Sequence, residues 1–123
     1  MKVLADTSVW IDHLRRPLRD LTVLLDADTV IMHPAIIGEL ACGSLQNRSE
    51  ILKSLAELPP AFCATDGEVL ALIERRKLYS RGIGWVDAQL LTSAILSECE
   101  FWTLDSALSR AAAIVGLNAP TFQ

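Results

Sequence analysis

KVLADTSVWIDHL, residues 2–14, contains the signals of a strand, a turn and a helix in direct succession. Residues 2–5 form a short run of β-type residues, and residues 6–8 offer carboxylate and hydroxyl groups that can cap a helix. The apolar residues after them recur at helical spacing: Val9, Trp10, Ile11 and Leu14. A strand that leads straight into a capped helix is typical of an α/β unit.

The rest of the chain repeats this alternation. Further strands are predicted at 29–32, 62–65 and 101–104, and further helices at 18–26, 35–44, 51–58, 66–82 (capped by Asp66), 86–98 and 105–115. Parallel strands need crossover connections, which helices supply. We therefore expect an α/β fold in which helices cover both faces of a mainly parallel central sheet. At 123 residues, the chain has room for one domain, 1–123.

Composition excludes several classes of protein. Hydrophobic residues make up 51% and charged residues 21%, which excludes a disordered chain and favours a partner or self-association surface. No apolar run is long enough for a signal peptide or a membrane span. Cys42, Cys63 and Cys99 form no C-x-x-C pair, so neither a disulfide framework nor a zinc ribbon is indicated. We expect a soluble protein of the cytoplasm.

The net charge of −4 limits how the chain can bind nucleic acid, because the overall field repels a polyanion. Any such binding must be local or assisted by a metal. Two short basic runs, Arg15-Arg16 with Arg19 and Arg75-Arg76-Lys77 with Arg81, are either solvated helix faces or phosphate contacts. Core packing is the expected role of Trp10, Trp85 and Trp102, and ordinary packing or surface placement that of His13 and His33.

Four acidic residues stand where α/β proteins bind ligands, near the carboxyl ends of strands. Asp6 and Asp105 follow predicted strands, and Asp87 lies in the first turn of its helix, so each has an alternative role as a helix cap. Glu39 has no such role, because it lies in mid-helix. Its face carries small residues, which suggests that another group approaches the helix closely: Ala35, Gly38, Cys42 and Gly43.

If these four acids converge, a positive charge must balance their negative charges. Asp87 shares its helix face with Leu90 and Leu91, so this face enters the core and turns the carboxylate toward the strand ends. Four carboxylates in one place would raise one another's pKa unless a divalent cation neutralises them. Such hard oxygen ligands suit Mg²⁺ or Mn²⁺ better than zinc.

The four acids and their surroundings resemble the motifs of PIN-domain ribonucleases, in particular the toxin components of VapBC toxin–antitoxin systems. The resembling stretches are VLADTSVWID at 3–12, IIGEL around Glu39, VDAQLL at 86–91 and TLD at 103–105. The resemblance implies a three-layer α/β/α PIN-like domain. It also implies that Asp6, Glu39, Asp87 and Asp105 bind Mg²⁺ or Mn²⁺ and catalyse the reaction, with support from three hydroxyl-bearing residues: Thr7, Ser8 and Thr103.

By this resemblance the chain is a metal-dependent endoribonuclease, the toxin of a type II pair. It implies an RNA substrate, a small cognate antitoxin, a homodimer, and contact with operator DNA only through the antitoxin. Asp12 is either an exposed helix acid or a water-mediated neighbour of the site. Two alternatives stay open: a catalytically silent PIN-like binding module, and a receiver-like signalling domain. The second lacks an acid pair after the first strand and a lysine near the last.

Overall fold

The computed structural model describes residues 1–122 and is built on a parallel sheet of three strands. The central strand β1 (Val3–Ala5) lies between β2 (Val30–Ile31) and β3 (Glu100–Trp102). Leu4 is opposite Ile31 on one side and Phe101 on the other, and both pairings are parallel. The predicted parallel α/β class is confirmed.

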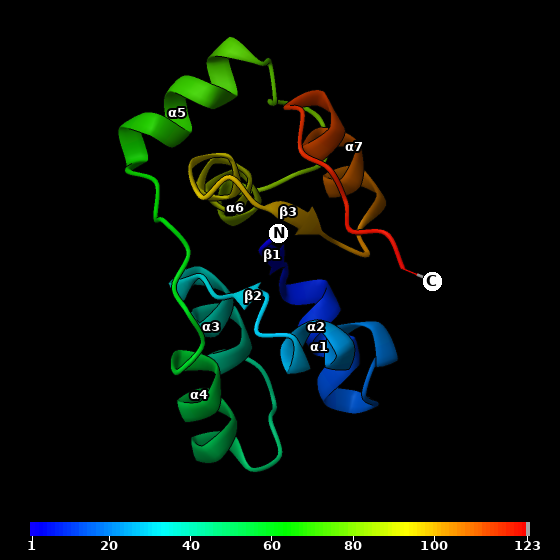
Figure 1. Ribbon diagram of the computed structural model, residues 1–123. Helices are drawn as coiled ribbons and strands as arrows, with labels where there is room; N and C mark the ends of the chain where they lie inside the picture. The colour runs from blue at the N-terminus through cyan, green and yellow to red at the C-terminus, as the bar shows by residue number, and fades with distance from the viewer. Residues whose placement is uncertain (123) are drawn as a thin grey trace.

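Helices cover both faces of this sheet, as Figure 1 shows. On one side lie α1 (Thr7–Arg15), α2 (Arg19–Asp26), α3 (Pro34–Ala41) and α4 (Arg48–Ala56). On the other side lie α5 (Asp66–Arg75), α6 (Trp85–Leu96) and α7 (Ser106–Ile114). The three-layer arrangement expected from the sequence is confirmed. None of the helices within residues 1–122 has the length and apolar character of a membrane span.

The core lies where the two helical layers meet the sheet. All three residues of β1 are buried, as expected for a parallel strand that is covered on both faces. From α1, Val9 and Trp10 enter the core. The central helix α6 is buried over most of its length, from Ala88 to Ala94 with Gln89 partly exposed. This packing fixes the end of β1 against the starts of α1 and α6.

The predicted strand 62–65 is wrong. The chain makes one parallel bridge, between Met32 and Pro60, with Met32 N–H donating to Pro59 O at 2.8 Å. Two backbone N–H groups further on donate to Ser93 of α6 and to Ser97, the residue that caps its C-terminal end. Phe62 N–H donates to Ser97 Oγ at 2.9 Å, and Ala64 N–H donates to Ser93 Oγ at 3.0 Å. The segment is held by a helix and so does not join the sheet.

Ser93 is therefore expected to contribute strongly to stability. Its side chain is fully buried, accepts from Ala64 N–H and lies 3.1 Å from His33 Nε2. Ser93→Ala leaves these partners unsatisfied and should lower the free energy of unfolding by about 1–3 kcal/mol. Denaturant unfolding measures the loss. Ser97→Ala, at a partly exposed serine that holds one backbone group, is the matched control; losses of equal size would contradict this assignment.

One predicted cap and several predicted helix boundaries also need correction. Thr65, and not Asp66, caps α5: Thr65 Oγ1 accepts from Glu68 N–H at 3.2 Å, and Glu68 Oε1 accepts from Thr65 N–H at 2.8 Å. The helix predicted at 66–82 ends at Arg75, because Lys77 takes a left-handed conformation with φ of 52°. Leu78 then returns to the core with 2% of its surface exposed. The helix predicted at 35–44 ends at Ala41.

Candidate active site

Asp6 is the buried centre of the candidate site. It follows β1 directly and caps α1, with 4% of its surface exposed. Its Oδ1 accepts from Ser8 N–H at 3.1 Å and from Ser8 Oγ at 2.5 Å. Its Oδ2 accepts from Thr103 Oγ1 at 2.8 Å. Helix capping and hydroxyl contacts together fix both carboxylate oxygens at the end of the central strand.

Burial raises the pKa of Asp6 above its usual value, and the hydrogen bonds from Ser8, Thr103 and Val9 oppose this rise only in part. No cation of the described residues 1–122 is among the causes of the shift. A buried carboxylate whose charge is not balanced by Lys or Arg fits a site for a metal cation.

Thr103 links Asp6 to Asp105. Its hydroxyl donates to Asp6 and accepts from Asp105 N–H at 3.0 Å. Ser8 strengthens the same connection, because its Oγ accepts from Leu104 N–H at 3.0 Å. Asp105 itself caps α7: its Oδ1 accepts from Leu108 N–H at 3.0 Å. The loop after β3 is thereby tied to the start of α1.

Glu39, on α3, is held by the residue that follows Asp6. Thr7 Oγ1 donates to Glu39 Oε1 at 2.5 Å, which bridges α1 and α3 beside Asp6. The Glu39 side chain is exposed. No group of the described protein approaches this helix face at Gly38, because a Cβ added there would meet no atom within 4 Å. The face around Glu39 is open to a ligand.

The fourth acid, Asp87, bonds to the backbone at the start of its own helix. It lies in the first turn of α6, partly buried, and its Oδ2 accepts from Gly84 N–H at 2.9 Å. None of the hydrogen bonds found within residues 1–122 joins it to Asp6, Glu39 or Asp105. Over the same residues, no three Asp, Glu, His or Cys side chains lie together closely enough to hold one metal ion. The predicted convergence of four carboxylates is not formed in this conformation.

The cap role and the site role of these acids are compatible. Asp6, Asp87 and Asp105 all make the capping contacts that the sequence offered as the alternative explanation. Asp87 and Asp105 use one carboxylate oxygen each for this purpose. A second oxygen on each is left for other ligands. Asp12 is exposed on α1 and makes no side-chain hydrogen bond within the described chain.

His33 positions the helix that carries Glu39, a role that the sequence did not reveal. Its side chain is 6% exposed and caps α3, with Nδ1 accepting from Ala35 N–H at 3.0 Å. Because Nδ1 accepts, the proton of the neutral ring lies on Nε2, which faces Ser93 Oγ at 3.1 Å. Ser93 is 60 residues away in sequence, and no local pattern pairs the two.

Acid should weaken the fold through His33. Burial lowers the pKa of His33 below 6.5, so the unfolded chain binds a proton more readily than the folded one. Stability from this residue is complete above pH 6.5 and should fall as the pH drops below that value. His33→Asn keeps a cap acceptor but cannot titrate, so it should lose less stability between pH 7 and about 5. Equal losses in urea unfolding series for both proteins would contradict this role.

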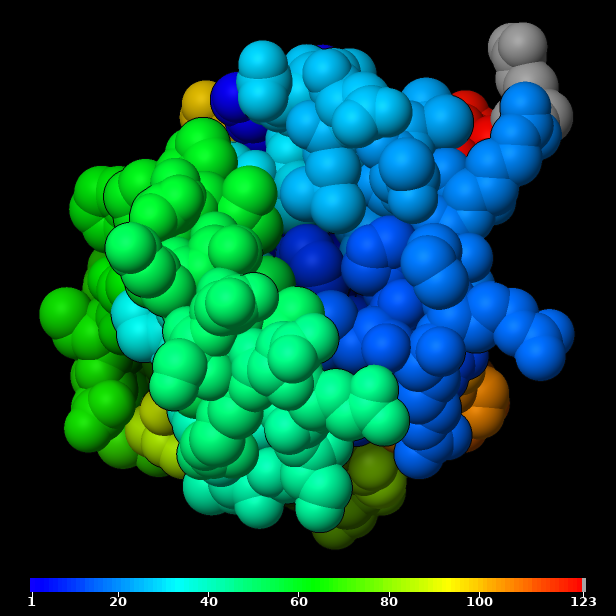
Figure 2. All heavy atoms as spheres, turned by 90° about the horizontal axis from the view of Figure 1, so that it is seen from below, coloured from blue at the N-terminus to red at the C-terminus, as the bar shows by residue number. Residues whose placement is uncertain are grey.

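A pocket of about 560 Å³ opens beside Glu39, between α1 and the α3–α4 connection. In Figure 2, the atoms of α1 and those of the α3–α4 connection lie on opposite sides of this pocket. The pocket wall is mainly apolar, with Glu39 and Arg15 as its charged members: Ile11, Leu14, Arg15, Glu39, Leu40, Gly43, Ser44, Leu45, Gln46 and Ile51. Arg48, which donates to the carbonyls of Ala41 and Gly43, holds this connection in place.

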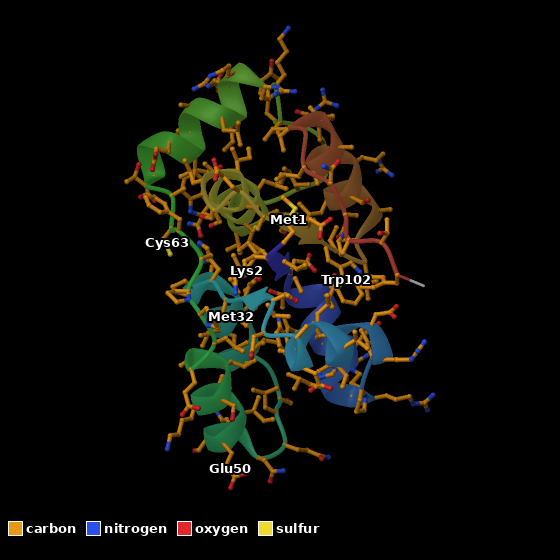
Figure 3. The ribbon with its side chains drawn as sticks, in the orientation of Figure 1. Met1, Lys2, Met32, Glu50, Cys63 and Trp102 are labelled. Carbon is orange, nitrogen blue, oxygen red and sulfur yellow. The ribbon has the colours of Figure 1, made fainter. Side chains whose placement is uncertain are left out.

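The three tryptophans differ from one another in exposure. Trp10 is buried with 2% exposed, and Trp102, at the end of β3 in Figure 3, is partly buried against Phe122 at a ring distance of 4.7 Å. Trp85 has 41% of its surface exposed. The core role expected for Trp85 is wrong.

Comparison with known proteins identifies the family of this chain. Residues 3–114 match the family model described as PIN domain. Two relatives are each named Ribonuclease VapC32, from Mycobacterium tuberculosis strain CDC 1551 / Oshkosh and from strain ATCC 25618 / H37Rv. Each is 45% identical over 116 residues, which is 94% of this chain and 94% of the relative. The range matched by the family model, 3–114, includes all four acids.

Proposed function

Because this chain belongs to the PIN-domain family, we propose that it is a divalent-metal-dependent endoribonuclease that hydrolyses RNA phosphodiesters. The observation that carries the proposal is the buried Asp6 carboxylate, which Thr103 links to Asp105, with Thr7, the next residue in the chain, bonded to Glu39. The relatives named as ribonucleases, similar over nearly the whole chain, support the same reaction.

The donor set fits Mg²⁺ or Mn²⁺. All of the candidate ligands are carboxylate oxygens, which these ions prefer, and Asp6 is buried without a balancing cation. We propose that Asp6, Glu39, Asp87 and Asp105 hold the metal, with Asp87 and Glu39 turning toward Asp6 on binding. A metal ion bound by them would lower the pKa of a bound water and stabilise charge on the leaving oxygen.

The hydroxyl side chains of the site would then hold the acidic metal ligands in position. Thr7 restrains the exposed Glu39 carboxylate, and Thr103 aligns Asp6 with the backbone of Asp105. Ser8 fixes the other oxygen of Asp6 and the loop after β3. Because water is the attacking group in this proposal, no side chain needs to form a covalent intermediate.

We further propose that the chain is the toxin of a type II toxin–antitoxin pair in the cytoplasm and works as a homodimer. An antitoxin segment with apolar side chains would suit the pocket beside Glu39, where it would block the approach of RNA. Operator DNA would be reached only through the antitoxin. Exposed Leu70 and Leu96, on the helices α5 and α6, offer apolar area for a second copy.

Cleavage of a pool of single-stranded and structured RNAs tests the reaction. The purified protein, freed of antitoxin, is incubated with Mn²⁺ or with EDTA. We expect RNA fragments with Mn²⁺ and none with EDTA. Intact RNA under both conditions, from a protein shown to be folded, would favour the silent binding module. Fragments in EDTA would contradict the dependence on metal.

A further inference from the structure

The connection between α5 and α6 gathers positive charge on a protein of negative net charge. Residues 75–81 contain four of the eleven Lys and Arg residues and no Asp or Glu. Arg75, Arg76, Lys77 and Arg81 are all exposed. Figure 3 shows nitrogen-tipped side chains at the end of α5 and on nearby α7. A local positive surface of this kind is what a net-negative protein needs to bind a polyanion.

Large apolar side chains are exposed in and near the same connection. Tyr79 has 55% of its surface exposed, Trp85 41% and Leu104 50%. Trp85 lies two residues before Asp87, and Leu104 directly precedes Asp105. The exposed ring of Trp85 therefore belongs to the same turn of α6 as one candidate metal ligand.

The connection is held in a defined shape. Leu78 anchors it in the core, and Arg81 Nε donates to Lys77 O at 2.7 Å. Gly82, with φ of 78°, brings the chain so close to α7 that an added Cβ would lie 3.5 Å from Ala107 Cβ. Ala107 is in the first turn of α7, which Asp105 caps. The backbone before Trp85 thus passes the first turn of α7, next to Asp105, and leads into α6, which carries Asp87.

We propose that residues 75–85 form an RNA subsite that continues from the metal site, with an unpaired base stacked on Trp85 and flanking phosphates contacted by Arg75, Lys77 and Arg81. This inference rests on the proposed function and adds the path that the bound RNA follows. Aromatic rings stack with bases of any sequence, and Arg and Lys side chains neutralise phosphates. The charge of the segment favours RNA over a protein partner as its occupant.

Binding without catalysis tests the subsite. A fluorescein-labelled single-stranded RNA is titrated with the full chain in EDTA, and anisotropy gives Kd. Trp85→Leu should weaken binding at least about fivefold, whereas Trp85→Phe keeps a ring and should retain most of it. Arg81→Gln should weaken binding and reduce the dependence of log Kd on log salt by roughly one phosphate contact. Matched controls are Phe62→Leu, at an aromatic residue with 64% exposed, and Arg19→Gln in the other basic run; neither should change Kd.

Equal Kd values for wild type, Trp85→Leu and Arg81→Gln would overturn the subsite. The same holds if Trp85→Leu instead changes the sedimentation of the protein, since the ring would then face another copy of the chain. Cleavage assays in Mn²⁺ separate this failure from failure of the proposed function. If the wild type cleaves RNA and the variants bind RNA normally, the nuclease proposal stands and the subsite proposal is overturned. If the wild type binds RNA through Trp85 but does not cleave it, the subsite proposal stands and the nuclease proposal is overturned. If the wild type does not bind RNA, the subsite proposal is overturned.

Discussion

Asp6→Asn is expected to slow metal-dependent RNA cleavage about 1000-fold or more. Asp6 is the most deeply buried of the four acids and contacts both Ser8 and Thr103, so its charge is central to any metal held there. Loss of a metal-ion contribution of several kcal/mol corresponds to a rate effect of about this size. Single-turnover cleavage in Mn²⁺ measures it.

The same substitution should not harm the fold, which makes the result interpretable. Burial raises the pKa of Asp6 above 3.8, so the ionised form costs stability at neutral pH. Asn at this position should leave the free energy of unfolding at pH 7 unchanged or higher. That advantage over wild type should shrink as the pH falls through the raised pKa toward 3.8. Normal cleavage by a folded Asp6→Asn protein would contradict the assignment.

Glu39→Gln is expected to reduce both Mn²⁺ affinity and cleavage, the latter about 100-fold or more. Gln keeps the length of the side chain and can still accept from Thr7, so the loss reports the charge alone. Because Glu39 is exposed, stability should change by less than about 0.5 kcal/mol. Isothermal titration with Mn²⁺ and cleavage assays on one preparation give both quantities.

Glu57→Gln is the matched control for this experiment, since it neutralises another exposed glutamate, which caps the C-terminal end of α4 on the same side of the sheet. It should leave Mn²⁺ affinity and cleavage unchanged. If the two variants lose equal activity, the effect comes from the overall charge, and Glu39 has no special role. If neither loses Mn²⁺ affinity, the metal lies elsewhere.

Local patterns predicted the framework of the fold well. The β-type run at 2–5 became β1, and the cap residue Asp6 starts α1 because its partners Ser8 and Val9 lie two and three residues away. The prediction for 62–65 was wrong because the parallel bridge to Met32 is made by Pro60, before this segment, and the N–H groups of residues 62 and 64 donate to serine side chains. Ser93 and Ser97 are about thirty residues distant, so no local signal revealed the competition.

The candidate site shows the same division between local and distant information. Each acid could be identified from its own position in the sequence. Asp6, for example, follows a predicted strand, and Glu39 lies where it has no cap role. The hydrogen bonds of these acids could not be predicted, because Thr103 is 97 residues from Asp6 in the sequence and Thr7 is 32 residues from Glu39. Trp85 was assigned to the core from its size, yet it lies at the first position of α6 and is partly exposed.

Crystallisation of the protein with Mn²⁺, followed by anomalous scattering, tests the metal site most directly. We predict an ion within about 2.0–2.3 Å of a carboxylate oxygen of Asp6, with oxygens from at least one of Glu39, Asp87 and Asp105 in the same coordination shell. Asp87 should then have turned away from Gly84 N–H. An ion bound only at other surface acids, with Asp6 still contacted by Ser8 and Thr103 alone, would contradict the account.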